Sequence, residues 1–417
     1  MIVKRLLASL ETADSSRRAR GAASLARAYL TEGLTDSELL DAETALTALL
    51  DDPVVAVRKA MARVLASSPD APMHVISTLA CDHSTVAARV LTHSPLLADD
   101  DLIDALAVAD GYAQVAIALR PHVSGRVATG VAETGCREAM IALAVNETAN
   151  LDEAAMLRMV ERHGNDGEVR EALLLRTGLP TNVRAALAAE TARALQAFAE
   201  KTGWLSPQRS ERCTREARDA AVIEIAARAH AETGAPPLAL ARQLRSASQL
   251  TPSLLLRALL SGERSLFEAS LTALSGMDQR RVSGLVKAWS GAGFAALYSK
   301  AALPARLLAA FRAALAAQDA TGLIYEPGFR PKLSSLLIDR TLKACEASGS
   351  PDLKNVKALL HRLRAEAVRA DARIMSMEMI AAARAAKLAA PAVAAPAIAI
   401  DMDAIEAEIC APGIMAA

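Results

Sequence analysis

Apolar residues recur at helical spacing along most of the chain. In the segment 51–66, Met61 follows Val57 by four positions, and Val64 and Leu65 follow Met61 by three and four, which places them on one face of a helix. Similar apolar runs follow at steps of about 24 to 30 residues, which is typical of helical repeats. Their aligned positions are Val57, Val86, Val115, Ala139 and Val169. Between them lie second apolar runs at 73–80, 100–108, 126–132 and 152–161. The pattern predicts successive pairs of short helices.

A short helix pair cannot bury its own apolar face, so each pair needs a neighbour against which to stack. We therefore predict an all-α fold, an α-solenoid of degenerate two-helix repeats with a long C-terminal helix. The clearest loop signal is the Gly- and Pro-containing stretch 319–332, where we place a boundary. The predicted division is 1–200 for N-terminal repeats, 201–320 for C-terminal helical repeats, 333–388 for a hairpin with a long helix, and 389–417 for a linker and tail.

Capping residues mark several helix starts. Thr35 and Glu38 have the spacing of a capping box, in which each side chain binds the backbone amide of the other residue. Ser206-Pro207 and Thr251-Pro252 place proline in the first helical turn, directly after a capping residue. From these signals we expect helices at 181–201, 207–231, 237–247, 252–260, 264–275, 278–290, 293–300, 304–318 and 333–347.

The stretch 353–388 reads as one long helix with an apolar seam at alternating steps of three and four residues. The seam residues are Leu353, Val356, Leu360, Leu363, Ala367, Ala370, Ile374 and Met377. Two interpretations remain open: the seam packs on the preceding helix of the same chain, or it forms a homodimer through 353–388. Lys and Arg outnumber Asp and Glu along this helix, so its exposed face is basic.

The last residues combine a stiff linker with an acidic segment. The Ala/Pro stretch 389–397 cannot build a core and is typical of a semi-rigid linker. After it, Ile398, Met402, Ile405 and Ile409 recur at helical spacing among acidic residues. We interpret these four residues as a docking motif for a groove in the same chain or in a partner; the alternative is a disordered chain end.

Composition supports the helical prediction and narrows the function classes. Hydrophobic residues make up 52% of the 417 residues but aromatic residues only 3%, which favours helices packed through small side chains over β-sandwiches. Lys+Arg and Asp+Glu both number 47, so the chain lacks the basic excess of most nucleic-acid binders. The high Ala content and the predominance of Arg over Lys are typical of a bacterial genome rich in G and C.

No residue pattern predicts catalysis, a metal or a cofactor. The five cysteines lie far apart and form no C-x-x-C pair, so a reducing, cytoplasmic location is expected. The chain contains no H-E-x-x-H, G-x-S-x-G or phosphate-binding loop. The apolar run at the start is too short for a signal peptide, and no uninterrupted stretch of about 18 apolar residues predicts a membrane span.

One unit carries a recognisable motif. Asp52-Pro53, followed by Val57-Arg58, Ala60, Ala62 and Leu65, resembles the HEAT repeat. Together with 250–259, 267–269, 293–298 and 303–304, the chain is similar to an uncharacterised bacterial family with HEAT-like repeats, a domain of unknown function, over about residues 45–320. The resemblance implies a fold, no established activity and no catalytic residues.

The predicted function is a scaffold or adaptor, because a helical solenoid presents an extended surface suited to binding a peptide or helix of a protein partner. Two alternatives remain. One is nucleic-acid binding like that of the HEAT-like DNA glycosylases, which the neutral net charge disfavours. The other is a repeat-based enzyme such as the HEAT-like bilin lyases, for which no residue constellation is present.

Overall fold

The computed structural model describes residues 13–31, 34–321, 332–347 and 354–389. Within these ranges every regular element is a helix and no strand occurs, which confirms the all-α prediction. None of the described helices has both the length and the apolar composition required to cross a membrane. Ala and Leu, which have high helix propensity, are frequent in these helices.

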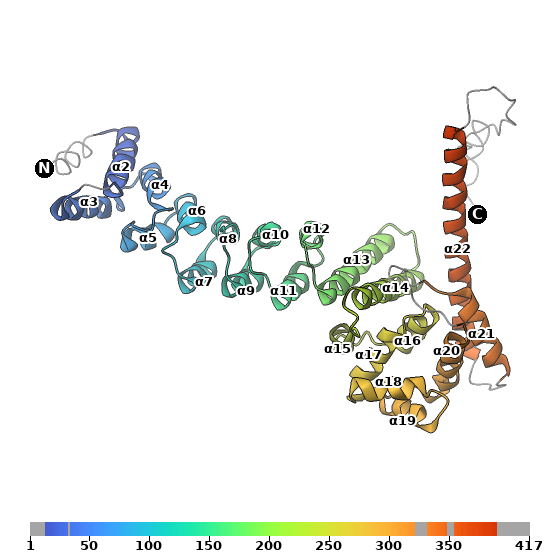
Figure 1. Cartoon of the computed structure of the whole chain (residues 1–417). Coiled ribbons are helices and arrows are strands. Elements are labelled where there is room, and N and C mark those ends of the chain that lie inside the picture. Colours follow the sequence, from blue (N-terminus) through green and yellow to red (C-terminus); the bar gives the residue numbers. More distant parts are fainter. Residues whose placement is uncertain (1–12, 32–33, 322–331, 348–353, 390–417) are drawn as a thin grey trace.

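Short helices make up the first part of the described chain. They are α2 (Ser15–Tyr29), α3 (Asp36–Leu49), α4 (Val55–Leu65), α5 (Met73–Ala80), α6 (Ser84–His93), α7 (Asp99–Val108), α8 (Gly111–Ala118), α9 (Gly125–Thr134), α10 (Arg137–Val145), α11 (Glu153–His163) and α12 (Gly167–Leu175). Successive even-numbered helices from α2 to α12 pack against each other in one row, and α7, α9, α11 and α13 pack in a second row (Figure 1).

Longer helices and a second group of short ones follow. They are α13 (Thr181–Lys201), α14 (Pro207–Thr233), α15 (Leu238–Ser246), α16 (Pro252–Leu260), α17 (Arg264–Ser275), α18 (Gln279–Lys287), α19 (Ala292–Lys300), the 3₁₀ turn η1 (Ala305–Leu307), α20 (Leu308–Thr321), α21 (Ser335–Ala347) and α22 (Lys354–Ala389). The helices α13 and α14 form an antiparallel hairpin, and α22 extends beyond the other helices in its C-terminal half (Figure 1).

Two of the predicted caps form in the structure, whereas Ser206 precedes α14 without a side-chain cap hydrogen bond. Thr35 accepts a hydrogen bond from the Glu38 amide, and the Glu38 carboxylate accepts one from the Thr35 amide, which is the predicted capping box. Thr251 caps α16 by accepting from the Leu254 amide. Local sequence alone sets these caps, because each joins residues three positions apart.

Two apolar cores account for most of the buried side chains. The first runs without interruption from Ala22 to Leu187 between the two rows of short helices. The second runs from Leu255 to Ala367 and contains the stacked rings of Phe267 and Phe311, whose centroids are 5.6 Å apart. A smaller cluster joins α13, α14, α15, α16 and α17.

Arg–Asp ion pairs connect consecutive helix pairs in the first row. Arg18 binds Asp52 at 2.8 Å, and Arg137 binds Asp166 at 2.7 Å. Asp166 also caps α12 through the Glu168 and Val169 amides. Such an aspartate therefore fixes the start of its own helix and ties it to the preceding pair.

The boundary of the predicted loop at 319–332 is wrong by three residues. The helix α20 continues through Asp319 to Thr321. Asp319 is held there by tertiary contacts, since it accepts hydrogen bonds from Arg264 at 2.9 Å and from the Trp289 indole at 2.7 Å. These partners lie 55 and 30 residues away in the chain, so local turn signals cannot report them.

Candidate functional site

A groove of about 630 Å³ lies between the first half of α14 and the middle of α22. Its floor consists of small side chains, two from each helix: Ala217, Ala220, Ala365 and Ala370. Its walls are charged and carry Arg209, Arg212, Glu216, Arg362, Glu366, Arg369 and Arg373, with Cys213 beside them. Small floor residues leave room for an elongated ligand such as a helix to approach closely.

Positive charge dominates this groove. Five arginines line it, and only two glutamates do. The Glu366 carboxylate is already compensated, because it accepts two hydrogen bonds from Arg257 of α16, at 2.8 and 2.6 Å. Arg257 is buried, with 3% of its surface exposed. The wall arginines Arg369 and Arg373 are exposed. A ligand that carries several carboxylates would therefore be attracted to the groove.

A buried carboxylate lies under the α14 side of the groove. Asp219 is 2% exposed, and its nearest ion-pair partner, Arg218, is 3.9 Å away. Burial raises the pKa of Asp219 to about 6, and the positive charges of Arg218 and Arg257 only partly offset this effect. Asp219 therefore destabilises the folded chain at neutral pH. Perturbed carboxylates of this kind are frequent at functional sites, although structural ones also occur.

The predicted seam of α22 is divided between two environments. Val356, Leu360 and Leu363 are buried in the second core, where α22 packs on α21. Ile374 and Met377 are 42% and 69% exposed. The first half of the seam thus packs within the chain, whereas Ile374 and Met377 do not. Leu353 lies outside the described residues, and so do the docking residues Ile398, Met402, Ile405 and Ile409.

A second apolar stripe on α22 was missed in the sequence. Val368, Ala372, Met375 and Met379 follow one another at steps of four, three and four residues and are all exposed. This spacing places them on one face, distinct from the buried seam. The spacing is visible in the sequence, but the apolar seam at 353–377 is the longer helical pattern of the two. The stripe faces about a third of a turn away from the groove residues Arg362, Glu366 and Arg369, so it is a separate exposed surface of α22.

Aromatic side chains have two different roles. Phe294 and Tyr298 fill the second core, and Trp289 packs at its edge. Trp204, in contrast, fills no gap between helices, because it is 73% exposed. Its ring packs edge-on against that of Phe198, with centroids 5.4 Å apart, at the tip of the α13–α14 hairpin. The short turn after Lys201 places it outside every core.

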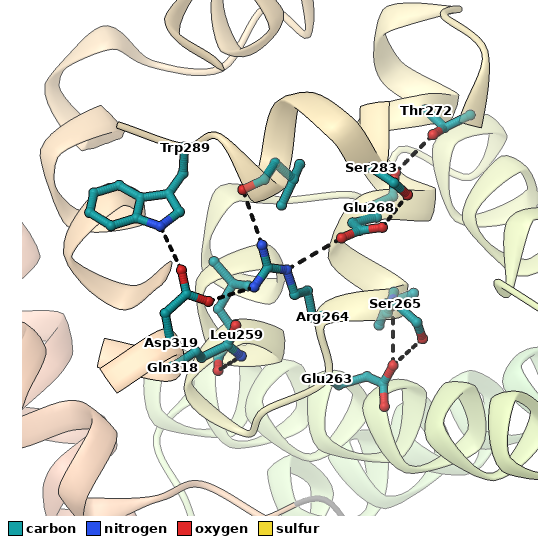
Figure 2. A network of polar contacts seen from close by, with 12 residues as sticks. Leu259, Glu263, Arg264, Ser265, Glu268, Thr272, Ser283, Trp289, Gln318 and Asp319 are labelled. Carbon is teal, nitrogen blue, oxygen red and sulfur yellow. Dashed lines mark hydrogen bonds and ion pairs between the residues drawn. The ribbon is translucent and has the colours of Figure 1, made fainter. Parts of the chain in front are cut away.

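A polar network centred on Arg264 joins α17, α18 and α20 (Figure 2). Its guanidinium binds Glu268 at 3.3 Å, Asp319 at 2.9 Å and the Val286 carbonyl at 3.1 Å. Glu268 also accepts a hydrogen bond from Ser283. Because Arg264 pairs with Glu268 of its own helix and with Asp319 of α20, we interpret the network as a structural clamp.

Metal-binding geometry is absent from the described residues, where no group of three or more His, Cys, Asp or Glu side chains converges. Cys81, Cys136 and Cys213 form no disulfide.

Comparisons with known proteins place the chain in a family. No curated protein and no solved structure matches it. The model of one protein family, described as "Uncharacterised protein conserved in bacteria (DUF2336)", matches residues 86–326, which is more than half of the 417 residues. The match includes α14 and its wall of the groove, whereas α22 follows the matched region. The chain belongs to this bacterial family of uncharacterised proteins, DUF2336.

Proposed function

We propose that this protein is a scaffold that binds an acidic, amphipathic helix of a partner protein in the groove between α14 and α22. The observation that carries the proposal is the combination of an alanine floor with five arginines on the walls. A helix can lie on the small floor residues while its carboxylates bind the arginines.

We further propose that the rows of short helices form an α-solenoid of the HEAT-like kind. Two features support this idea: alternate helices pack in separate rows, and Arg–Asp pairs repeat between consecutive units. In such an architecture the rigid stack would position the groove relative to other partners. The cytoplasmic location, the absence of enzymatic activity and a homodimer through 353–388 remain predictions.

Nucleic-acid binding is the competing function, because arginines also bind phosphates. Two features favour an acidic helix instead. The groove contains its own glutamates, Glu216 and Glu366, and a polyanion gains little from the apolar floor. The equal totals of basic and acidic residues provide no long-range attraction to nucleic acid.

Fluorescence anisotropy with the full-length protein tests the proposal. The probe is a labelled, designed helical peptide of about 16 residues, with acidic residues on one face and Ile or Leu on the other. We expect a Kd in the micromolar range, weakened at least about tenfold by Arg369→Glu with Arg373→Glu, which corresponds to about 1.4 kcal/mol.

The control variant combines Arg27→Glu and Arg63→Glu. It makes the same change in net charge on α2 and α4, far from the groove along the chain, at two exposed positions. Equal weakening by both double variants would overturn the assignment of the groove. A labelled oligonucleotide that binds with steep salt dependence, while the peptide does not bind, would favour the nucleic-acid alternative.

A further inference from the structure

We propose that the groove is occupied in the same chain by the acidic segment 398–409, which competes with the partner helix. The inference rests on the proposed function, because it assumes that the groove accepts acidic helices. It adds a regulatory step: a partner binds only when this segment leaves. The segment lies outside the described residues, so the argument uses its sequence together with the geometry of α14 and α22.

The chemistry of the segment complements that of the groove. Its acidic residues, Asp401, Asp403, Glu406 and Glu408, provide four carboxylates for the five arginines of the walls. Its apolar residues, Ile398, Met402, Ile405 and Ile409, recur at helical spacing and can face the alanines of the groove, Ala217, Ala220, Ala365 and Ala370. Both components that the groove requires of a ligand are thus present within one stretch of twelve residues.

The chain length also permits this contact. Arg373 precedes the last residue of α22, Ala389, by sixteen positions, which is about 24 Å along the helix. The eight residues 390–397 can span up to about 26 Å when extended. The acidic segment can therefore return along α22 as far as Arg373 and Arg369. A tether of this length gives an effective concentration of about 1 mM, so even a weak contact would be populated.

A second copy of α22 is a less suitable occupant. Placed in the groove, it would bring its own Arg362, Arg369 and Arg373 close to the same residues of the first copy and to Arg209 and Arg212. Like charges at short distance oppose association. The acidic segment, by contrast, neutralises the groove.

Cys213 provides a reporter within the groove, and Cys81 provides a matched control. Both thiols are exposed, and Cys81 lies at the end of α5, in the first row of helices. Full-length protein is treated with N-ethylmaleimide, and the alkylation rate at each cysteine is measured by peptide mapping. The variant carries Asp401→Asn, Asp403→Asn, Glu406→Gln and Glu408→Gln, which removes the acidic charge and keeps the side-chain size.

We expect Cys213 to react at least about fivefold faster in this variant, and Cys81 to react equally fast in both proteins. In the wild-type protein, 1 M salt should accelerate alkylation of Cys213, because it screens the attraction between the acidic segment and the arginines of the groove. An unchanged Cys213 rate would overturn the inference. Protection that disappears on dilution would also overturn it, because the segment would then come from a second copy.

The peptide-binding assay separates this inference from the proposed function. If the neutralised variant binds the designed peptide several-fold more tightly than wild type, competition by the segment is supported. If the peptide binds equally well to both proteins and the Cys213 rate is unchanged, the inference fails and the proposed function stands. If Cys213 is alkylated faster in the neutralised variant but the peptide binds to neither protein, the intramolecular contact stands and the proposed function fails.

Discussion

Arg58 on α4 and Asp82, which directly precedes the N-cap of α6, form a bidentate ion pair across two successive helix pairs. The Nε–Oδ2 distance is 2.5 Å and the Nη2–Oδ1 distance is 2.8 Å. The side chains are only 16% and 13% exposed. Arg58 also donates to the Asp52 carbonyl, so one guanidinium connects two consecutive turns between helices. Equivalent pairs join Arg18 to Asp52 and Arg137 to Asp166.

Asp82→Asn should destabilise this region by about 2 kcal/mol, because a partly buried, charge-assisted pair loses its charge on one side. Burial raises the pKa of Asp82. The hydrogen bonds from Arg58 and from the His83 amide and the charge of Arg58 together lower it by more, so the pKa lies below its ordinary value. A depressed pKa stabilises the folded state above the unfolded-state pKa of about 4, and this contribution is lost as the pH falls. The difference between variant and wild type should therefore shrink in acid.

Thermal unfolding at pH 7 and below pH 4 measures this effect. Asp100→Asn is the control, since the Arg126–Asp100 pair is 66% and 76% exposed. Such a surface pair contributes at most about 0.5 kcal/mol. Equal effects of the two substitutions would show that the Arg58–Asp82 pair does not tie the helix pairs together.

The sequence predicted those features of the fold that local patterns determine. Thr35 and Glu38 bind each other three positions apart, and the run 73–80 coincides with α5. The features it did not predict depend on distant contacts. Asp319 stays helical through Arg264 and Trp289, and the groove exists only because α22 lies beside α14, about 150 residues earlier in the chain. Arg209 and Arg373 are unremarkable until folding places them on facing walls.

Glu366→Gln should loosen α22 from the rest of the molecule. The substitution leaves the buried Arg257 guanidinium without its carboxylate partner. Removing one member of a buried pair costs about 3 kcal/mol, at the lower end of the usual range because the Glu366 side chain is 36% exposed. Hydrogen exchange of the α22 amides between Val356 and Ala367 should accelerate.

Asp339→Asn is the matched control for that experiment. It removes another ion-pair partner of α22, Arg364, whose side chain and that of Asp339 are 51% and 40% exposed. We expect an effect below about 0.5 kcal/mol and unchanged hydrogen exchange. If Glu366→Gln behaves like this control, the Arg257–Glu366 pair does not anchor α22.

The two classes of aromatic residue should respond differently to truncation. Phe294→Ala leaves a cavity in the second core, where the side chain is fully buried, and should destabilise by about 3–5 kcal/mol. Trp204→Ala removes only an exposed ring and its contact with Phe198, so it should cost about 1 kcal/mol or less. Chemical unfolding of both variants checks this prediction, and comparable losses would show that Trp204 contributes to a core.

Asp219→Asn should stabilise the protein at neutral pH. The folded state holds the Asp219 proton more tightly than the unfolded state, because burial raises the pKa to about 6 from its ordinary value of 3.8. The contribution of this group is therefore fully present below about pH 4 and is lost as the pH rises through 6, by up to about 3 kcal/mol. Asparagine has nearly the same shape and cannot ionise, so it avoids this loss. Melting temperatures should be higher than wild type at pH 7.5 and similar at about pH 3.5.

Glu211→Gln on the same helix separates this effect from a general loss of negative charge on α14. Glu211 pairs with Arg215 at the surface, where the two side chains are 63% and 52% exposed. The control should change stability by less than about 0.5 kcal/mol at both pH values. A lower melting temperature of Asp219→Asn at pH 7.5 would mean that attraction to Arg218 and Arg257 outweighs burial. Asp219 would then stabilise the α14 wall of the groove as a carboxylate, and the sign of its pH dependence would be reversed.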